Sequence, residues 1–297
     1  MQTLAFWILV LMILLVVVTV VTAVTWSVWK KPWVPLQGFS PTVQSFEMSE
    51  TRPPRRKSTL VVMACHTSTK ERVDIILNNI PYFSEIADEM VLIDSAEFQS
   101  NGLESKIRSA FPGLRFQMYH IPNDPLFLCH DKYLFYLQGF FPHYHMLERV
   151  ILTNDSILVC HSLVPFGKLK DSEDYDMTSM VASRQIQYHF TDFLRSYSTS
   201  VIPSLVQYFV KNRHKVHSNA SLIQHYEIES TFVFKRKKAL LEAESGYYEN
   251  IHYDDKKIRE YLTKYQYPIL KVKKLVHMRY HEWKDWVPLR VHSFLPK

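Results

Sequence analysis

Two polar side chains that can bind metal ions, Asn154 and Asp155, follow a short apolar run in the stretch Arg149–Ser156. The run Val150–Leu152 is typical of a strand buried in a parallel sheet, so the polar pair is expected where that strand ends. Open α/β sheets bind ligands at the carboxyl ends of their strands, and an Asp placed there can hold a divalent cation and, through it, a diphosphate. A simple turn is the alternative interpretation, because Asn, Asp and Ser all favour turns.

The chain from residue 59 onward alternates between expected strands and helices. Strands are expected at 59–65, 89–94, 114–120 and 149–153, and helices at 70–79, 102–110 and 132–141. Pro81 is expected to end the first of these helices. The alternation predicts a Rossmann-like α/β fold, with a mostly parallel sheet, flanking helices and right-handed crossovers.

Glycine is scarce, which excludes the commonest nucleotide-binding motifs. The 297 residues contain six glycines, no Gly-x-Gly-x-x-Gly follows the first expected strand, and no P-loop is present. The first strand also lacks the paired aspartates of an aspartyl-phosphate phosphatase. The acids at strand ends are therefore Asp94, after the second strand, and Asp155, after the fourth. For Asp94, a helix cap or turn before Ser95 is the alternative.

The first 29 residues carry no charged side chain and predict a single transmembrane helix. Residues 4–24 are apolar over a length that can cross a hydrocarbon core of roughly 30 Å, which implies a lipid bilayer as partner. A cleaved signal peptide is the alternative, but it usually begins with basic residues. Lys30 and Lys31 favour a cytosolic body. A lumenal body of the Golgi or endoplasmic reticulum type II arrangement is common among sugar-transferring enzymes, and we expect it here with the cytosolic body as alternative.

Residues 30–57 contain five prolines and predict an extended stem, so that residues 58–297 form the body. The net charge of +6 is uneven: residues 30–57 carry +4 and the basic terminal segment 256–297 carries +8, which leaves −6 for residues 58–255. A basic terminal segment suits an anionic lipid surface or a sugar-nucleotide diphosphate. The acidic body and the expected anchor disfavour nucleic acid as a partner.

The three cysteines, Cys65, Cys129 and Cys160, are too few for a disulfide framework, and each is followed by His. Zinc accepts both ligand types, but structural zinc sites usually show close pairs such as Cys-x-x-Cys. We interpret the repeated Cys-His dipeptide as coincidence. A zinc-dependent hydrolase built on these dipeptides is a further alternative.

Four stretches resemble a known family in their order and type: PNDPLFLCHDKYLFYL, MLERVILTNDS, EDYDMTSMVAS and EIESTFVFKRKKAL. They are similar to the rhamnan-synthesis protein F group of polysaccharide glycosyltransferases, which carries a strand ending in Thr-Asn-Asp-Ser. The resemblance covers roughly residues 59–241, and TNDS is its nearly literal part. It implies a GT-A-type fold that transfers a sugar from a nucleotide-diphosphate donor to a glycan or polysaccharide acceptor.

The sequence departs from that family at two places. Glu229 stands where the family tends to have Gln, and residues 188–221 are interpreted as an insertion. The insertion contains an expected amphipathic helix at 203–211 and a basic loop with the sequon at Asn219. A second sequon begins at Asn154, but the one at Asn219 is the better glycan site if the body is lumenal, because it lies in the polar insertion. Because of the insertion, the family's substrate is not carried over.

The resemblance assigns roles on the donor side. Sugar transfer needs the charge of the leaving diphosphate neutralised, by Mn²⁺ or Mg²⁺ or by basic side chains. Asp155 is the expected metal ligand, and Asn154 is expected to position the sugar or a metal-bound water. Asp94 is expected to contact the base or ribose of the nucleotide.

The basic tail offers further candidates in the stretch LVHMRYHEWKDW. His277 and His281 are four residues apart, lie on one face if helical, and are expected to complete the metal site. Arg279 and Lys284 are expected to meet the diphosphate. Surface histidines beside two tryptophans packed on the body are the alternative.

Two glutamates are candidates for the catalytic base of an inverting transfer. Glu227 and Glu229 precede the apolar run 230–234, which is expected to form a strand. Because residues two apart on a strand share a face, both are expected to point into one cleft and take the acceptor's proton. A solvated strand end is the alternative for each.

These patterns together predict a membrane-anchored glycosyltransferase of hexosyl- or deoxyhexosyltransferase type, dependent on a divalent metal. The alternative from another class is a catalytically inactive GT-A-fold protein that binds carbohydrate or acts as a scaffold. The incomplete Asp-x-Asp motif, Glu229 and the expected insertion leave that alternative open.

Overall fold

The computed structural model describes residues 56–96, 102–124, 128–141, 146–242 and 251–273. The expected membrane span, the stem up to residue 55 and the tail from residue 274 lie outside these ranges. Within them, no helix is long and apolar enough to cross a bilayer.

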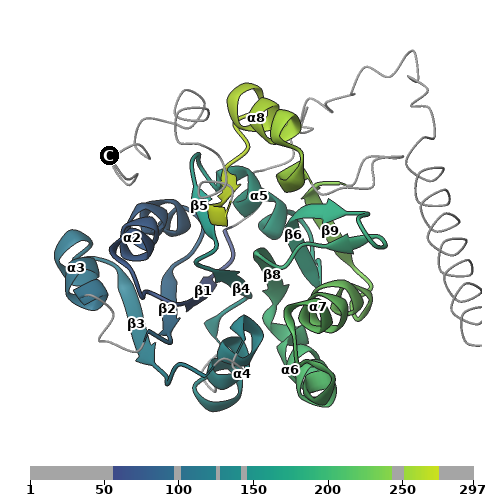
Figure 1. Cartoon of the computed structure of the whole chain (residues 1–297), viewed down its shortest axis with the longest axis horizontal. Helices are drawn as coiled ribbons and strands as arrows, with labels where there is room; N and C mark the ends of the chain where they lie inside the picture. The colour runs from purple at the N-terminus through teal and green to yellow at the C-terminus, as the bar shows by residue number, and fades with distance from the viewer. Residues whose placement is uncertain (1–55, 97–101, 125–127, 142–145, 243–250, 274–297) are drawn as a thin grey trace, which may run out of the picture. The chain divides into compact units, whose positions relative to one another are not determined.

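The body is built on a mixed sheet that has eight strands in the described residues, in the order β3-β2-β1-β4-β8-β6-β7, with β9 paired to β6. Four parallel strands form one half: β1 (Thr59–Cys65), β2 (Glu89–Asp94), β3 (Arg115–His120) and β4 (Arg149–Asn154). The other half contains β6 (Met177–Ser183), β7 (His189–Phe190), β8 (Leu194–Ser198) and β9 (Lys237–Leu241). In it β8 runs antiparallel to β4 and β6, whereas β9 runs parallel to β6 (Figure 1). The predicted mostly parallel α/β sheet is confirmed.

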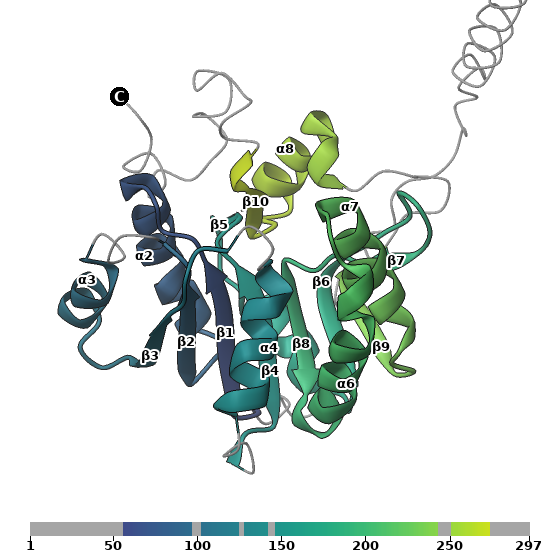
Figure 2. The same ribbon diagram turned by 60° about the horizontal axis from the view of Figure 1, so that its bottom comes forward.

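Helices cover both faces of the sheet because its central strands are apolar on both sides. Along β1, Val61 and Met63 join one core and Leu60 and Val62 join the other, as the two-residue period of a strand requires. The first core is covered by α2 (Lys70–Ser84), α3 (Leu103–Ala110), α5 (Val164–Ser172) and α8 (Asp255–Lys264). The second is covered by α4 (Cys129–Gly139), α6 (Ile202–Asn212) and α7 (Asn219–Leu222) (Figure 2).

The helix α2 continues past Pro81, contrary to the predicted end at residue 79. Proline removes one backbone hydrogen bond there, but Ile80 and Phe83 on either side are fully buried in the core. Pro81 itself is exposed, so its ring meets solvent. Burial of the flanking side chains therefore outweighs the lost bond.

Residues 188–221, interpreted as an insertion, belong to the framework of the fold. They contain β8, which lies between β4 and β6 in the main sheet, and the predicted amphipathic helix, observed as α6. The sequence of β8, LRSYS, is short and polar and gives little strand signal. β8 is therefore part of the framework of the fold, since the sheet would be split without it.

The apolar run 230–234 is not a strand. A π-helical segment, Ile223–Ile228, leads directly into a 3-10 turn, Glu229–Phe232. Side-chain hydroxyls support this helical course: Thr231 Oγ1 donates to Glu227 O at 3.0 Å and accepts from Phe190 N at 3.1 Å. Phe232 is 54% exposed although Ser230 and Phe234, two positions away on either side, are buried, so the burial does not follow the two-residue period of a strand.

A small antiparallel sheet brings the end of the described chain beside β4. It pairs β5 (Ile157–Val159), which directly follows the Asn-Asp-Ser stretch, with β10 (Ile269–Lys271). Val272 N then donates to Ser156 O at 2.8 Å. The residues after β10 are therefore held against the turn that follows β4.

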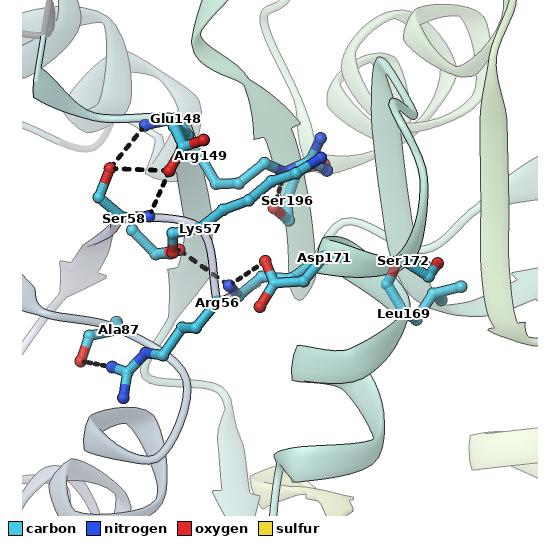
Figure 3. A network of polar contacts seen from close by, with 12 residues as sticks. Arg56, Lys57, Ser58, Ala87, Glu148, Arg149, Leu169, Asp171, Ser172 and Ser196 are labelled. Atoms are coloured by element: carbon cyan, nitrogen blue, oxygen red, sulfur yellow. Dashed lines mark hydrogen bonds and ion pairs between the residues drawn. The ribbon is translucent and has the colours of Figure 1, made fainter. Parts of the chain in front are cut away.

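The amino-terminal edge of the parallel strands carries a polar network that fixes the start of the body (Figure 3). Arg56 donates to Ala87 O at 2.9 Å, and Ser58 N donates to the Glu148 carboxylate at 3.0 Å. Lys170, fully buried, lies 2.7 Å from the Asp171 carboxylate. The chain therefore enters the sheet at the edge opposite the carboxyl ends of β1 and β4.

Candidate active site

A pocket of about 660 Å³ opens at the carboxyl ends of β1 and β4. Its floor is the turn Asn154–Ser156, and its walls come from α4, the segment between β6 and β8, the π-helical segment and the residues after β10. This is the edge at which open α/β sheets bind ligands. Residues far apart in the chain therefore meet in one cavity.

Asp155, the expected metal ligand, lies on the floor of this pocket. Its amide donates to Ala64 O at 3.1 Å, which ties the turn to the end of β1. Its carboxylate accepts a hydrogen bond from His66 N at 2.8 Å and lies 3.5 Å from Arg72 Nη1. Burial raises the pKa of the Asp155 carboxyl, although the charge of Arg72 opposes that shift. Both carboxylate oxygens thus already have a partner from the protein.

Asn154 also lines the pocket, but its side chain closes the turn in which it lies. Its Oδ1 accepts hydrogen bonds from Ser156 N, at 3.1 Å, and from Ser156 Oγ. This is the local bonding that makes Asn a turn former. The turn interpretation is therefore confirmed, and the turn forms part of a pocket.

Asp94 ends β2 and is fully buried. Its carboxylate accepts hydrogen bonds from Thr67 N at 3.0 Å, from Thr67 Oγ1 and from Ala96 N at 3.2 Å. These bonds hold together the loops that follow β1 and β2. Asp94 does not line the pocket, so its position favours support of the loops over the expected contact with the nucleotide.

The side chains of Glu227 and Glu229 point in different directions, because residues two apart in the helical segment 223–232 do not share a face. Glu227 lines the pocket with its side chain 14% exposed. Glu229 is 37% exposed, lies outside the pocket lining and bonds to His225 Nδ1 and Gln224 Nε2, each at 3.0 Å. The expectation of a shared face is wrong, and Glu227 is the glutamate that the pocket contains.

Glu227 meets a second carboxyl group, that of Asp192, which sequence reasoning missed. The Asp192 amide donates to Glu227 Oε1 at 3.3 Å. Burial, together with the charge of Asp192, raises the pKa of Glu227 to about 8. Burial opposes ionisation of Asp192 too, but His130, Lys271 and Arg195 hold its pKa below the usual value. Burial and the charge of Asp192 therefore favour the protonated form of Glu227 near neutral pH.

Arg195, on β8, holds these two carboxyl-bearing segments together. Its guanidinium is almost fully buried and donates to Thr191 O at 3.1 Å, to Glu227 O at 2.8 Å and to Ser230 Oγ at 2.8 Å. Thr191 lies next to Asp192, so one side chain fixes both the turn after β7 and the π-helical segment. Arg195 therefore acts as a positioning residue.

Four cationic side chains line the same pocket: Arg72, Lys132, Lys271 and Lys273. Lys132 is buried, and its ammonium donates to Cys65 O and to Ser95 Oγ, the latter at 2.7 Å. Against them stand three carboxyl groups, those of Asp155, Asp192 and Glu227. The lining therefore carries an excess of positive charge.

One group of three metal-ligand types occurs in the described ranges: Cys129, His130 and Asp192, whose ligand atoms all lie within 4.8 Å of one another. Thiolate and imidazole suit zinc-like ions and not Mn²⁺ or Mg²⁺. Burial lowers the pKa of His130 to about 4, so its imidazole is neutral, which is the form that binds metals, and burial raises the pKa of the Cys129 thiol well above its usual value. Positive charge on Lys271 and Arg195 beside Asp192 disfavours a cation there.

The other two Cys-His dipeptides contribute nothing to this group. His66 Nδ1 lies 3.2 Å from Ser95 Oγ, and His161 Nε2 lies 3.0 Å from Leu262 O. Cys65 and Cys160 are buried thiols. The three dipeptides therefore do not converge on one site.

The expected Mn²⁺ or Mg²⁺ ion does not fit the residues at Asp155. Such ions bind through carboxylate oxygens and water. Here one oxygen of Asp155 accepts from His66, the other faces the positive charge of Arg72, and the Asn154 oxygen is held by Ser156. The tail candidates His277, His281, Arg279 and Lys284 lie outside the described residues.

Sequence reasoning found Asp155 and Glu227 but missed Asp192, Lys132 and Arg195. Asp192 follows only the two-residue strand β7, which has no recognisable pattern. Lys132 is the first residue of the helix expected at 132–141, which begins at Cys129 in the structure. Arg195 lies in β8, whose sequence LRSYS gives little strand signal, so its burial could not be read from the sequence.

No protein-family model and no curated protein matches the chain. Among solved structures it is similar to 4-diphosphocytidyl-2C-methyl-D-erythritol synthase from Anaerococcus prevotii, with 11% identity, 63% of this chain and 87% of that chain covered, and a TM-score of 0.41. It is also similar to a mannosyltransferase from Pyrobaculum calidifontis in complex with GDP-Man and Mn²⁺, with 13% identity, coverage of 71% and 63%, and a TM-score of 0.43. At these TM-scores the likenesses establish no function. The resemblance to the rhamnan-synthesis protein F group stays a prediction.

Proposed function

We propose that the chain is a glycosyltransferase of GT-A type that uses a nucleotide-sugar donor, with its active site in the pocket at the carboxyl ends of β1 and β4. The observation that carries this proposal is the meeting of Glu227 with an excess of cationic side chains in one cavity. An inverting sugar transfer needs both: a base for the acceptor and positive charge for the departing diphosphate. The acceptor class, a glycan or polysaccharide, comes from the sequence resemblance.

Glu227 is the base in this proposal. In an inverting transfer the acceptor oxygen forms a bond to the anomeric carbon while its proton passes to a Glu227 carboxylate oxygen. The bond from the anomeric carbon to the diphosphate oxygen breaks, and the diphosphate leaves with the electron pair. The carboxylate form must be present for this step, so the Asp192 charge, which raises the pKa of Glu227, also makes it a stronger base.

The membrane anchor at residues 4–24 and a lumenal type II body belong to the same proposal. The anchor rests on the uncharged apolar start of the sequence. The lumenal orientation rests on its frequency among sugar-transferring enzymes, whereas Lys30 and Lys31 favour the opposite one. A cytosol-facing body is the alternative. Protease protection of the body in sealed microsomes distinguishes the two arrangements.

The proposal is tested with the full-length protein in detergent and a panel of nucleotide sugars, scored for donor hydrolysis and transfer. Glu227→Gln should lower turnover by roughly a hundredfold or more, as expected for loss of a general base. Glu229→Gln is the matched control, since its carboxylate lies outside the pocket lining, and it should retain turnover. Sugar binding without turnover of any donor would favour the inactive carbohydrate-binding scaffold instead.

A further inference from the structure

The turn Asn154–Ser156 is flanked by cationic side chains from two different elements. On one side, Arg72 in the first turn of α2 donates through Nη1 to Asp155 O at 2.9 Å. On the other side, Lys271 ends β10 in register with Ile157. The backbone of the turn is thereby held from both sides, by the Arg72 guanidinium and by the strand that carries Lys271.

The residues after β10 place two lysines on the pocket wall. Lys271 Nζ lies 4.3 Å from the centroid of the Phe193 ring, which also lines the pocket. Val272 is held by its bond to Ser156 O and is buried, whereas Lys273, next along the chain, is exposed at the lining. An ammonium group on a flexible stem can follow a phosphate as it moves, which suits a leaving group.

Arg72 brings a third cation to this side of the pocket. It lies in the first turn of α2, a helix of 15 residues that begins at Lys70. The side of the pocket beside the Asn154–Ser156 turn therefore combines three cationic side chains, from α2, from the end of β10 and from the residues that follow β10.

We propose that this pocket binds the donor's diphosphate directly through Arg72, Lys271 and Lys273, without a Mn²⁺ or Mg²⁺ ion. The inference rests on the proposed function and specifies which side chains of that site bind the departing nucleoside diphosphate. Four cations against three carboxyl groups leave positive charge for a dianionic diphosphate. A divalent cation would instead meet Arg72 beside an Asp155 carboxylate whose oxygens are already engaged.

The test measures binding of a panel of nucleoside diphosphates (UDP, GDP, ADP, CDP and dTDP) to the full-length protein in detergent by calorimetry. Each is titrated in excess EDTA, with Mn²⁺ and with Mg²⁺. At least one nucleotide should bind equally well in all three conditions. Binding should weaken as salt increases, because the contacts are ionic.

Lys271→Gln and Lys273→Gln should each weaken nucleoside diphosphate binding by roughly tenfold, the scale of one charge-assisted hydrogen bond. The matching nucleoside, which lacks phosphate, should bind all variants alike. Lys271→Arg should restore most of the binding. Lys168→Gln, at an exposed lysine of α5 outside the pocket, is the matched control and should bind as the unmodified protein does.

Three results would overturn the inference in distinguishable ways. Binding that appears with Mn²⁺ or Mg²⁺ and disappears in EDTA would overturn the metal-free site and leave the glycosyltransferase proposal standing. Metal-free binding that both lysine variants leave unchanged would overturn the assigned residues. If no nucleoside diphosphate binds in any condition, the proposed function itself fails. Circular dichroism of each variant keeps loss of folding apart from loss of binding.

Discussion

The amide of Asp192 donates a hydrogen bond to the carboxyl group of Glu227, with 3.3 Å between the nitrogen and Oε1. The two residues lie 35 positions apart, in the turn after β7 and in the π-helical segment, and Arg195 binds both segments. Because Asp192 stays ionised beside it, Glu227 holds its proton to an unusually high pH. This relationship makes the pocket's chemistry depend on pH near neutrality.

The first prediction is that transferase activity rises with pH up to about pH 8. Glu227 has its pKa raised to about 8, so its basic form gains population as pH approaches that value. The kcat/KM profile should therefore show an ascending limb with a midpoint near pH 8. Asp192→Asn removes the neighbouring negative charge and should move this limb to lower pH. A limb that stays in place in that variant would contradict the coupling.

The second prediction concerns the free energy of unfolding, which should fall as pH rises from about 5 to about 8. Glu227 titrates near 8 in the folded protein and near its ordinary value of 4.5 in the unfolded chain. Between these values the native state keeps a proton that the unfolded chain has released, so its contribution to stability is lost with rising pH. Denaturant unfolding across this range should show a flatter pH dependence for Glu227→Gln. An equally steep dependence in that variant would count against the raised pKa.

A third prediction is that Arg195→Met destabilises the protein by about 3 kcal/mol, since several buried acceptors lose their donor at once. Arg236→Met is the matched control. The Arg236 side chain is 64% exposed and pairs with Asp176 at 3.2 Å, so its loss should cost about 1 kcal/mol or less. Thermal unfolding of both variants measures the difference, and equal losses would refute the positioning role of Arg195.

The fourth prediction separates the two strand-end aspartates. Asp94→Ala should lower stability by roughly 1–3 kcal/mol, because it leaves the buried Thr67 amide and the half-buried Ala96 amide without their acceptor. Its nucleotide affinity at a temperature where it is folded should stay within about twofold of the unmodified protein, well below the tenfold steps that mark a lost charged contact. Calorimetry on the folded variant decides this. A selective loss of nucleotide binding would instead support the contact between Asp94 and the nucleotide that the sequence predicts.

The parallel half of the sheet could be predicted because its strands are continuous apolar runs. TLVVMAC and RVILTN are buried along their whole length, which is the pattern that a two-faced sheet requires. The ends of EMVLID and RVILTN then located Asp94 and Asp155 correctly at the carboxyl edge. What the pattern could not show is that Thr67 and Arg72 engage these carboxylates, since such partners depend on how the loops pack.

The antiparallel half escaped prediction for the opposite reason. β8 reads LRSYS and owes its place to Arg195 and to pairing on both sides, neither of which leaves a periodic signal. STFVF looks like a strand, but hydroxyl bonds from Ser230 and Thr231 to the preceding turn support a helical course. Tertiary contacts override local propensity at both places, and both places build the wall that carries Glu227 and Asp192.

The bonds of Arg56 and Ser58 fix the start of the body at the amino-terminal edge of the sheet. The distance from that edge to the pocket therefore separates the active site from anything attached ahead of Arg56. β1 has seven residues, so this edge lies roughly 20 Å from the pocket floor. A support or fusion partner attached ahead of Arg56 would therefore leave the mouth accessible. An acceptor attached to the same support would need a spacer of about that length to reach the pocket. Assays with immobilised protein should therefore compare several linker lengths.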